Sequence, residues 1–291
     1  MTPKDAEKNK IEGGTLYLVA TPIGNLSDFS ERAKKTLAEV DFVAAEDTRN
    51  TGKLFAAFGL SRPMVSYHEH NRRERGPQIV ARLQNGESCA LVTDAGMPAI
   101  SDPGEDLVAL CAANGVTVTA VPGCSAGITA LALSGLSTAR FAFEGFLPRD
   151  KKERRARLQR LITEERTMIF HEAPHRLTDT LAELAAAFGG ARQIALCREL
   201  TKRNEEILRT DLDGAILHYE ANEPRGEYVL ILAGGTAAPT AEESAVLDLS
   251  PAEHVAQLEA EGLSRMDAIK AAAKARGMAK NELYRILHTE K

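Results

Sequence analysis

The chain has 291 residues, of which 44% are hydrophobic, 26% charged and 5% aromatic, and its formal net charge is −5. This length and composition predict a globular protein with room for two domains of ordinary size. The negative net charge argues against binding nucleic acid through the overall field, so any such contact needs a local basic patch.

The four cysteines lie far apart and form no CxxC pair; they are Cys89, Cys111, Cys124 and Cys197. Their place in apolar segments predicts free thiols in a reducing compartment and argues against a Cys-ligated metal. The first ten residues are charged rather than apolar, and no apolar run reaches the ~18 residues of a membrane span. We therefore expect a soluble, cytoplasmic α/β protein without membrane contact.

Short β-rich runs alternate with helical segments in the first half of the chain, which predicts an open α/β sheet. The expected strands are 15–20, 41–45, 63–67, 89–92 and 116–121. Ser27 or Asp28 can cap the first helix, with Glu31 as the capping-box partner. Residues 78–83 and 107–113 are expected as later helices.

The loop at 93–104 carries two Gly, two Pro and two Asp between a buried strand and a helix. Loops at the carboxyl ends of strands bind ligands in open α/β sheets, and this loop is longer than a connection needs. Its backbone N–H groups with Asp94 and Asp102 suit a polar, partly cationic small molecule. A rigid loop whose Asp residues cap the helix explains the same sequence equally well.

Pro22 and Gly24 follow the first strand and so belong to the same sheet edge, without the dinucleotide fingerprint GxGxxG. Glu46, Asp47 and Arg49 follow the second strand, where they fit a general-base site or, preferably, an N-cap with a salt bridge.

Two further loops of the first half are open to more than one interpretation. The His68–His70 pair has no third ligand at a telling spacing, so no metal is predicted. The small residues at 123–127 suit close approach of an adenosine or tight helix–sheet packing.

The second half predicts another βαβ-like series after a domain crossing at 141–147, with strands at 167–170, 193–197, 205–210 and 227–232. A helix at 151–160 holds six basic residues and one acid, which fits a phosphate-binding stripe or a solvated face. Residues 236–248 are expected as a linker.

The tail predicts three short helices that begin at a capping box, Ser250 to Glu253. Gly262, Ser264 and Gly277 are expected to separate the helices, and Met266, Ile269 and Ala273 to share one face. The pattern resembles a helix-turn-helix, and a docking or dimer-packing role fits it about equally.

Six motifs in this order resemble the bacterial small-subunit ribosomal RNA methyltransferase I group of the tetrapyrrole-methylase superfamily. They are the segments 19–26, 45–49, 93–104, 121–126, 172–176 and 198–202. The resemblance implies 2′-O-methylation of a cytidine in the decoding region of small-subunit (16S) ribosomal RNA, with S-adenosylmethionine as methyl donor. It also implies a homodimer and two α/β domains of tetrapyrrole-methylase type, 14–145 and 146–236, with the donor between them and a helical module at 249–291.

The resemblance carries donor contacts onto Pro22, Gly24, Asp94, Ala95, Gly96, Met97, Ile100, Ser125, Ala126, Glu172 and Leu200. Tetrapyrrole-methylating relatives have Gly-Gly-Asp where this chain has Asp94-Ala95-Gly96, and they often have Met at Glu172. Catalysis is assigned to a carboxylate of Glu46, Asp47 or Glu172, with Lys202 or Arg49 holding phosphate. RNA contacts are assigned to Lys151, Lys152, Arg154, Arg155 and Arg157, and no metal is required.

Two other functions are consistent with the same residues. A tetrapyrrole methyltransferase shares the donor fold, although it has no need of the basic stripe at 151–160. A non-catalytic RNA-binding assembly factor would bind RNA with a salt dependence but transfer nothing.

Overall fold

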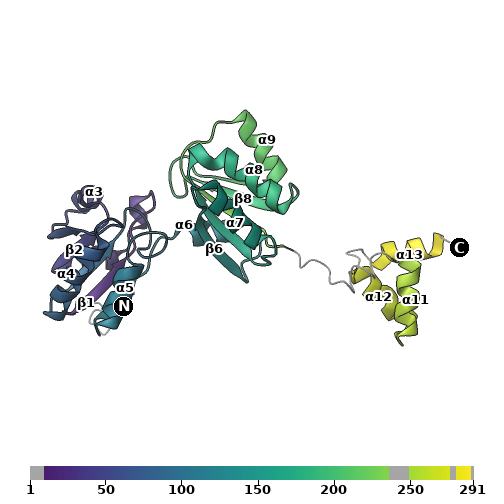
Figure 1. Ribbon diagram of the computed structural model, residues 1–291, viewed down its shortest axis with the longest axis horizontal. Coiled ribbons are helices and arrows are strands. Elements are labelled where there is room, and N and C mark those ends of the chain that lie inside the picture. The colour runs from purple at the N-terminus through teal and green to yellow at the C-terminus, as the bar shows by residue number, and fades with distance from the viewer. Residues whose placement is uncertain (1–9, 236–248, 276–279, 290–291) are drawn as a thin grey trace. The chain divides into compact units, whose positions relative to one another are not determined.

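The computed structural model describes residues 10–235, 249–275 and 280–289 (Figure 1). The chain divides into two compact units, residues 1–162 with 166–234 and residues 163–165 with 235–291. The larger unit contains two five-stranded sheets within its described residues. The α/β class predicted from the sequence is confirmed.

The first sheet has the strand order β3-β2-β4-β1-β5, and all of its pairings are parallel. Its strands are β1 (Thr15–Val19), β2 (Phe42–Ala45), β3 (Met64–Ser66), β4 (Cys89–Val92) and β5 (Thr117–Val121). All five expected strands of the first half are therefore present.

Alternation of side chains along β1 gives the first sheet two buried faces. Leu16 packs with helices α4 (Arg72–Gln84) and α5 (Glu105–Ala113), whereas Val19 packs with α2 (Glu31–Glu39) and α3 (Thr48–Phe58). Because the strands are parallel, the loops after all five emerge at one edge.

The second sheet has the order β6-β7-β10-β8-β9 and is mixed. Its strands are β6 (Phe141–Phe146), β7 (Thr167–Glu172), β8 (Gln193–Arg198), β9 (Glu206–Asp211) and β10 (Tyr228–Leu232). Only β6 and β7 pair in parallel; β10 runs antiparallel to β7 and β8, and β8 antiparallel to β9. The βαβ-like prediction is wrong for these antiparallel pairings.

Helices cover both faces of the second sheet. One face packs against α7 (Lys151–Leu161), α8 (Leu177–Phe188) and α9 (Leu212–Ala221). The other packs against α6 (Ala126–Leu133) and against Ile23 from the loop after β1. The segment expected as a domain crossing, 141–147, is strand β6 of this sheet, which therefore begins before the boundary expected at 145–146.

The expected helix cap at Ser27 or Asp28 is wrong. Ser27 and Asp28 lie in a 3-10 turn (Leu26–Asp28), and Ser30 caps α2 by accepting a hydrogen bond from the Ala33 N–H. The expected helix at 78–83 is confirmed as part of α4, which begins at Arg72 and includes Pro77. A second 3-10 turn (Pro174–Arg176) leads into α8.

The smaller unit holds α11 (Pro251–Ala260), α12 (Arg265–Ala275) and α13 (Lys280–Thr289) around its own apolar cluster. The capping box of Ser250 and Glu253 is confirmed, and Ser264 accepts a hydrogen bond from the Asp267 N–H. Met266 is 55% exposed, whereas Ile269 and Ala273 of the same helix are buried. Gly277 and the expected linker at 236–248 lie outside the described residues.

Over the described ranges, no helix combines the length and apolar character that crossing a bilayer requires. The same residues contain no group of three or more His, Cys, Asp or Glu side chains arranged to hold a metal ion.

Gly104, which precedes α5, provides a test of how tightly the loop at 93–104, the central loop, packs. Its φ is 140°, and a Cβ there would lie 2.7 Å from Leu91 Cδ2 in the buried strand β4. We expect Gly104→Ala to lower the free energy of unfolding by about 1–3 kcal/mol, measured by denaturant titration.

Gly52→Ala in α3 is the matched control, since a Cβ there meets nothing within 4 Å. It should raise stability slightly, by up to about 1 kcal/mol, because alanine is the better helix former. Equal effects of the two substitutions would contradict the tight packing at Gly104.

Candidate functional site

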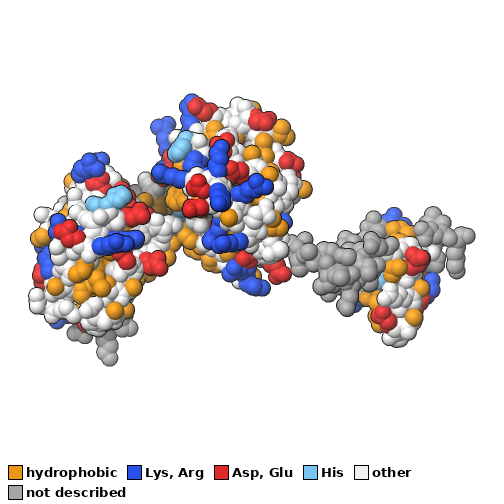
Figure 2. All heavy atoms as spheres, in the orientation of Figure 1, with side chains coloured by type: hydrophobic (Ala, Val, Ile, Leu, Met, Phe, Trp, Pro, Cys, Tyr) orange, Lys and Arg blue, Asp and Glu red, His pale blue; other side chains and the backbone are white. Residues whose placement is uncertain are grey.

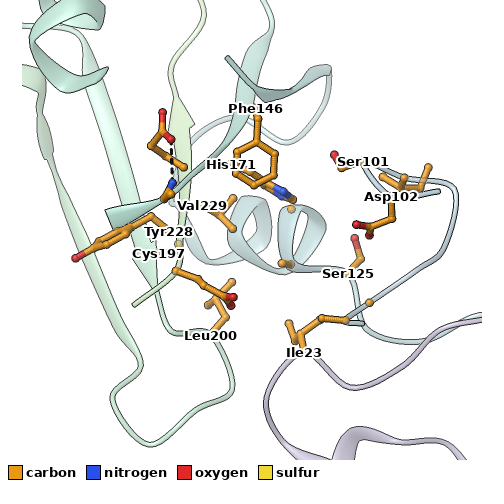
Figure 3. A pocket seen from close by; sticks show the side chains of 18 of the residues that line it. Ile23, Ser101, Asp102, Ser125, Phe146, His171, Cys197, Leu200, Tyr228 and Val229 are labelled. Carbon is orange, nitrogen blue, oxygen red and sulfur yellow. Dashed lines mark hydrogen bonds between the residues drawn. The ribbon is translucent and has the colours of Figure 1, made fainter. Parts of the chain in front are cut away.

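A cavity of about 460 Å³ opens where loops of the first sheet meet the second sheet (Figure 3). Figure 3 shows Ser101, Asp102 and Ser125 on one side, and Cys197, Leu200 and Tyr228 on another. The volume falls in the range of small-molecule sites. The lining is mainly apolar, with a few polar groups.

The first sheet contributes to the cavity from the loops after three adjacent strands. Ile23 follows β1, residues 95–97 and 100–102 follow β4, and residues 125–127 follow β5. Thr21 and Gly96 hold the first two loops together, since each backbone N–H donates to the other's carbonyl, at 2.9 and 3.1 Å. The Thr21 hydroxyl also donates to the Thr93 carbonyl oxygen.

The backbone on both sides of the cavity is strained. Four non-glycine residues of the described chain have φ between 49° and 67°, and they are Ala99, Ser101, Glu199 and Thr201. All four lie in the loop after β4 or the loop after β8, both of which reach the cavity. Such conformations cost about 1–3 kcal/mol each and cluster at functional sites.

Asp102 is the acidic residue of the central loop that lines the cavity. Its burial, together with the negative charges of Glu46 and Asp94, raises its pKa to about 7. The carboxyl group can therefore exchange a proton near neutral pH, which suits a general base. Asp102 belonged to the loop expected to bind ligand but not to the expected set of site residues, because spacing did not show which Asp is buried.

Glu46 and Asp94 do not line the cavity. The Glu46 carboxylate accepts a hydrogen bond from the Asp94 N–H, and Asp94 accepts one from the Asn50 side chain. Burial raises the pKa of Glu46. The strand order explains the placement of Glu46, since β2 lies on the side of β4 away from β1 and β5.

Asp47 and Arg49 also lie outside the cavity lining. Asp47 caps α3 through the Arg49 N–H, and its carboxylate pairs with the Arg49 guanidinium at 2.6 Å. The hydrogen bonds from Arg49 hold the pKa of Asp47 well below its usual range. The preferred interpretation, a cap with a salt bridge, is confirmed, and the alternative catalytic role at this pair is not supported by position.

Glu172 lines the cavity, yet its side chain is only 1% exposed. The carboxylate accepts hydrogen bonds from the Thr180 hydroxyl at 2.6 Å and from the Ala173 N–H at 2.9 Å. These contacts join β7 to α8, so the carboxylate has a structural partner on each oxygen.

Lys202 lines the cavity, and its ammonium group lies 2.9 Å from a Glu199 carboxylate oxygen and 2.8 Å from one of Glu227. A Cβ on Gly24 would lie 2.4 Å from Lys202 Cγ. Gly24 therefore lets the lysine stem pass close to the loop after β1. The Lys202 ammonium group, which was expected to hold phosphate, is therefore already paired with two carboxylates.

Eight of the eleven expected donor contacts line the cavity, namely Ala95, Gly96, Met97, Ile100, Ser125, Ala126, Glu172 and Leu200. Pro22, Gly24 and Asp94 do not line it, although each is a neighbour in sequence of a lining residue. Ser125 occupies the N-cap position of α6 without a capping hydrogen bond from its side chain in the described structure.

Sequence reasoning missed the aromatic wall of the cavity. Phe143, Phe146 and His171 come from β6 and β7, and both phenylalanine rings meet His171 edge-on, with centroids 5.4 Å apart. The available signal was the density of phenylalanine in 141–146 of a chain with few aromatics.

The basic stripe on α7 is not uniform. Figure 2 shows Lys and Arg side chains over the part of the chain that carries α7 and α8, with acidic side chains among them. Lys151, Lys152 and Arg155 are exposed. Arg154 is buried and paired with Glu183, so it faces inward, and Arg157 pairs with Glu144 at 2.6 Å.

Comparisons with known proteins place this geometry in context. A family described as tetrapyrrole (corrin/porphyrin) methylases matches residues 15–215. A protein of Halalkalibacterium halodurans named ribosomal RNA small subunit methyltransferase I is 45% identical over 290 residues, covering 100% of both chains. A protein of Pseudomonas aeruginosa with the same name is 48% identical, covering 94% of this chain and 96% of its own.

Solved structures share the fold at low identity. The methyltransferase CobJ aligns with a TM-score of 0.57 and 17% identity, over 76% of this chain and 95% of its own. Diphthine synthase aligns with a TM-score of 0.55 and 14% identity, over 75% and 89%.

The charge environment of Asp102 can be tested directly. We expect Glu46→Gln to lower the pKa of Asp102, because one of the two negative charges that oppose its ionisation is removed. Carboxyl-carbon NMR titration measures this shift.

Asp47→Asn is the control, since Asp47 is paired with Arg49 and does not contribute to the raised pKa of Asp102. A shift of Asp102 in the Asp47 variant but not in the Glu46 variant would contradict the described geometry.

Proposed function

Because the chain belongs to the tetrapyrrole methylase family and, within it, to the ribosomal RNA small subunit methyltransferase I group, we propose that it methylates a ribose of small-subunit ribosomal RNA. The donor is S-adenosylmethionine, and the target is the 2′-hydroxyl of a cytidine in the decoding region of 16S RNA. The supporting observation is the single cavity, among those described, that gathers eight of the expected donor contacts.

The residues present fit the donor. The backbone of 95–97 and the small residues 125–127 let an adenosine and its amino-acid tail approach closely, while Leu200 and Ile23 supply apolar surface. Asp102 adds a carboxyl group to the wall of the cavity, which suits a donor that carries a sulfonium cation. Bound there, the donor supplies an electrophilic methyl group and a neutral thioether leaving group.

The chain contributes mainly position and proton transfer. An in-line displacement needs oxygen, carbon and sulfur aligned, which the hydrogen-bonded loops after β1 and β4 favour. The ribose hydroxyl is a weak acid, so ionised Asp102 is proposed as the group that accepts its proton while the O–CH₃ bond forms. Glu46 and Asp94 support this role by raising the pKa of Asp102.

Asp102 is preferred as the base over the carboxylates expected from the sequence. Asp47 is paired with Arg49, and the Glu172 carboxylate is used by Thr180 and Ala173. Lys202 is proposed to position the loop at 199–202 rather than to bind phosphate, because Glu199 and Glu227 already pair with it.

RNA is preferred over a tetrapyrrole as acceptor on two grounds. The full-length relatives carry a ribosomal RNA name, and α7 exposes Lys151, Lys152 and Arg155. The proposal further includes a cytoplasmic homodimer acting on the small ribosomal subunit.

The decisive experiment compares transfer of labelled methyl from S-adenosylmethionine to three acceptors: small subunits from a strain lacking the gene, naked 16S RNA, and a precorrin-type tetrapyrrole. We expect label in alkali-resistant dinucleotides from the RNA of the subunits. Label only in the tetrapyrrole would overturn the proposal, and donor binding without any transfer would indicate a non-catalytic factor.

The role of Asp102 predicts a pH dependence. Since its pKa is about 7, the base is protonated below that pH, and the single-turnover rate should fall as pH drops through 7. Asp102→Asn should lower the rate by about 100-fold or more and remove this dependence. An unchanged rate would exclude Asp102 as the base.

Stability provides the control for folding of this variant. The pKa of Asp102 is raised on folding, so its contribution to the free energy of unfolding becomes less favourable as pH rises from about 4 to 7. Asp102→Asn should therefore be at least as stable as the parent at pH 8, which separates lost chemistry from lost structure.

The exposed basic residues of α7 predict a salt dependence. Replacing Lys151, Lys152 and Arg155 by Ala should weaken RNA binding and reduce the slope of log K against log salt by about 0.7–0.9 for each phosphate that is no longer neutralised. Lys34→Ala is the control, since Lys34 lies in helix α2, which packs against the first sheet. Equal slopes for the parent and the triple variant would exclude this face of α7.

A further inference from the structure

Strand β6 brings three phenylalanines onto one face by means of a bulge. Phe143 pairs with Ile169 and Phe146 with His171, and the register shifts between Phe143 and Gly145. Side chains alternate along a regular strand, so Phe146 would otherwise lie on the opposite face from Phe143. The additional residue, Glu144, restores the common face, and Gly145 takes the φ of 62° that this bulge needs.

The aligned rings remain exposed beside the cavity. Phe143 is 39% and Phe146 56% exposed, and both line the cavity, whereas Phe141 is 40% exposed and does not. Large apolar side chains gathered at the mouth of a cavity indicate a binding surface. β6 is an edge strand of the sheet, so one side of it has no neighbouring strand within the described residues.

His171 fixes the two rings without adding charge. Its imidazole meets both rings edge-on, and Figure 3 shows it next to Phe146. Burial lowers the pKa of His171, which keeps it neutral. Its Nε2 is buried and finds no hydrogen-bond partner among the described residues. The histidine thus acts as a neutral spacer behind a preformed aromatic surface.

The same bulge connects the aromatic surface to positive charge. The Glu144 side chain, 7% exposed, forms an ion pair of 2.6 Å with Arg157 of α7. The exposed Lys151, Lys152 and Arg155 lie on that helix. β6 is an edge strand, so the rings on the α6 face and the basic side chains of α7 on the other face flank the same edge of the sheet. Exposed aromatic rings together with basic side chains are the combination by which proteins hold unpaired nucleotides, through base stacking and phosphate contacts.

We propose that Phe143 and Phe146 form a stacking platform for the base of an RNA nucleotide turned out of its helix, with α7 holding the neighbouring phosphates. This inference rests on the proposed function and deepens it. A base stacked on these rings would present its ribose to the cavity that contains Asp102. The bulge at Glu144 and Gly145 is then the feature that places both rings on the face toward the cavity.

Charge favours RNA over a second copy of the chain on this surface. A two-fold interface centred on β6 would bring the basic residues of two α7 helices toward each other, since the same patch is used by both partners. An RNA strand carries the opposite charge along its whole length.

The test uses steady-state transfer to small subunits by the full-length protein. Phe146→Ala should raise KM for the subunit by at least about 5-fold, the effect of removing one stacked ring, and leave the Kd for S-adenosylmethionine unchanged. Phe146→Tyr keeps the ring and should restore KM. Phe141→Ala, which removes an exposed ring of the same strand outside the cavity, should match the parent.

Other outcomes would overturn the platform. A weaker donor Kd with an unchanged KM for the subunit would assign the rings to the donor. Dissociation of a dimer in sedimentation velocity would assign them to an interface between copies, and no effect of Phe146→Ala would exclude binding there.

Failure of the proposed function is distinguishable. If the parent protein transfers no methyl to RNA, the platform is tested by anisotropy of a fluorescent cytidine-containing oligoribonucleotide. Loss of binding in Phe146→Ala, with Phe141→Ala unchanged, would support it, and equal binding by both would overturn it.

Discussion

The cavity depends on the pair of backbone hydrogen bonds between Thr21 and Gly96. They join the loop after β1 to the loop after β4, which are neighbours because parallel strands end at one edge. With its own loop held in this way, Ile23 extends into the apolar core of the second sheet, beside Cys197 and Val229. The contact therefore couples the packing of both sheets to the shape of one site.

The site also concentrates features that lower the stability of the fold. Ala99, Ser101, Glu199 and Thr201 hold backbone conformations that side chains disfavour, and Asp102 is partly buried near two other acids. Such costs persist only where the surrounding packing determines the structure strongly. Here the buried strands β4 and β8, which precede the two strained loops, provide that packing.

Much of the fold could be predicted from the sequence, because strands of the first sheet are short apolar runs separated by clear turn residues. β6 was missed as a strand since its phenylalanines do not alternate regularly, and the bulge that explains them depends on pairing with β7. The direction of β10 could not be predicted either. Antiparallel pairing with β7 and β8 is a property of distant segments, which local patterns do not record.

The site was predicted in outline but not in its chemistry. Residues of the motif at 93–104 line the cavity, yet only the folded structure shows that Asp102 lines it whereas Asp94 and Glu46 do not. In the same way, a run of basic residues on α7 did not show that Arg154 turns inward to Glu183. The direction of the Arg154 side chain depends on its partner in the neighbouring helix α8, which the helical pattern of the sequence does not reveal.

The central claim, that the donor occupies the cavity joined by Thr21 and Gly96, is tested most directly by hydrogen exchange with and without S-adenosylmethionine. We expect added protection in three segments: 93–104, 122–128 and 198–202. Protection confined to other segments, such as the helices of the smaller unit, would contradict it.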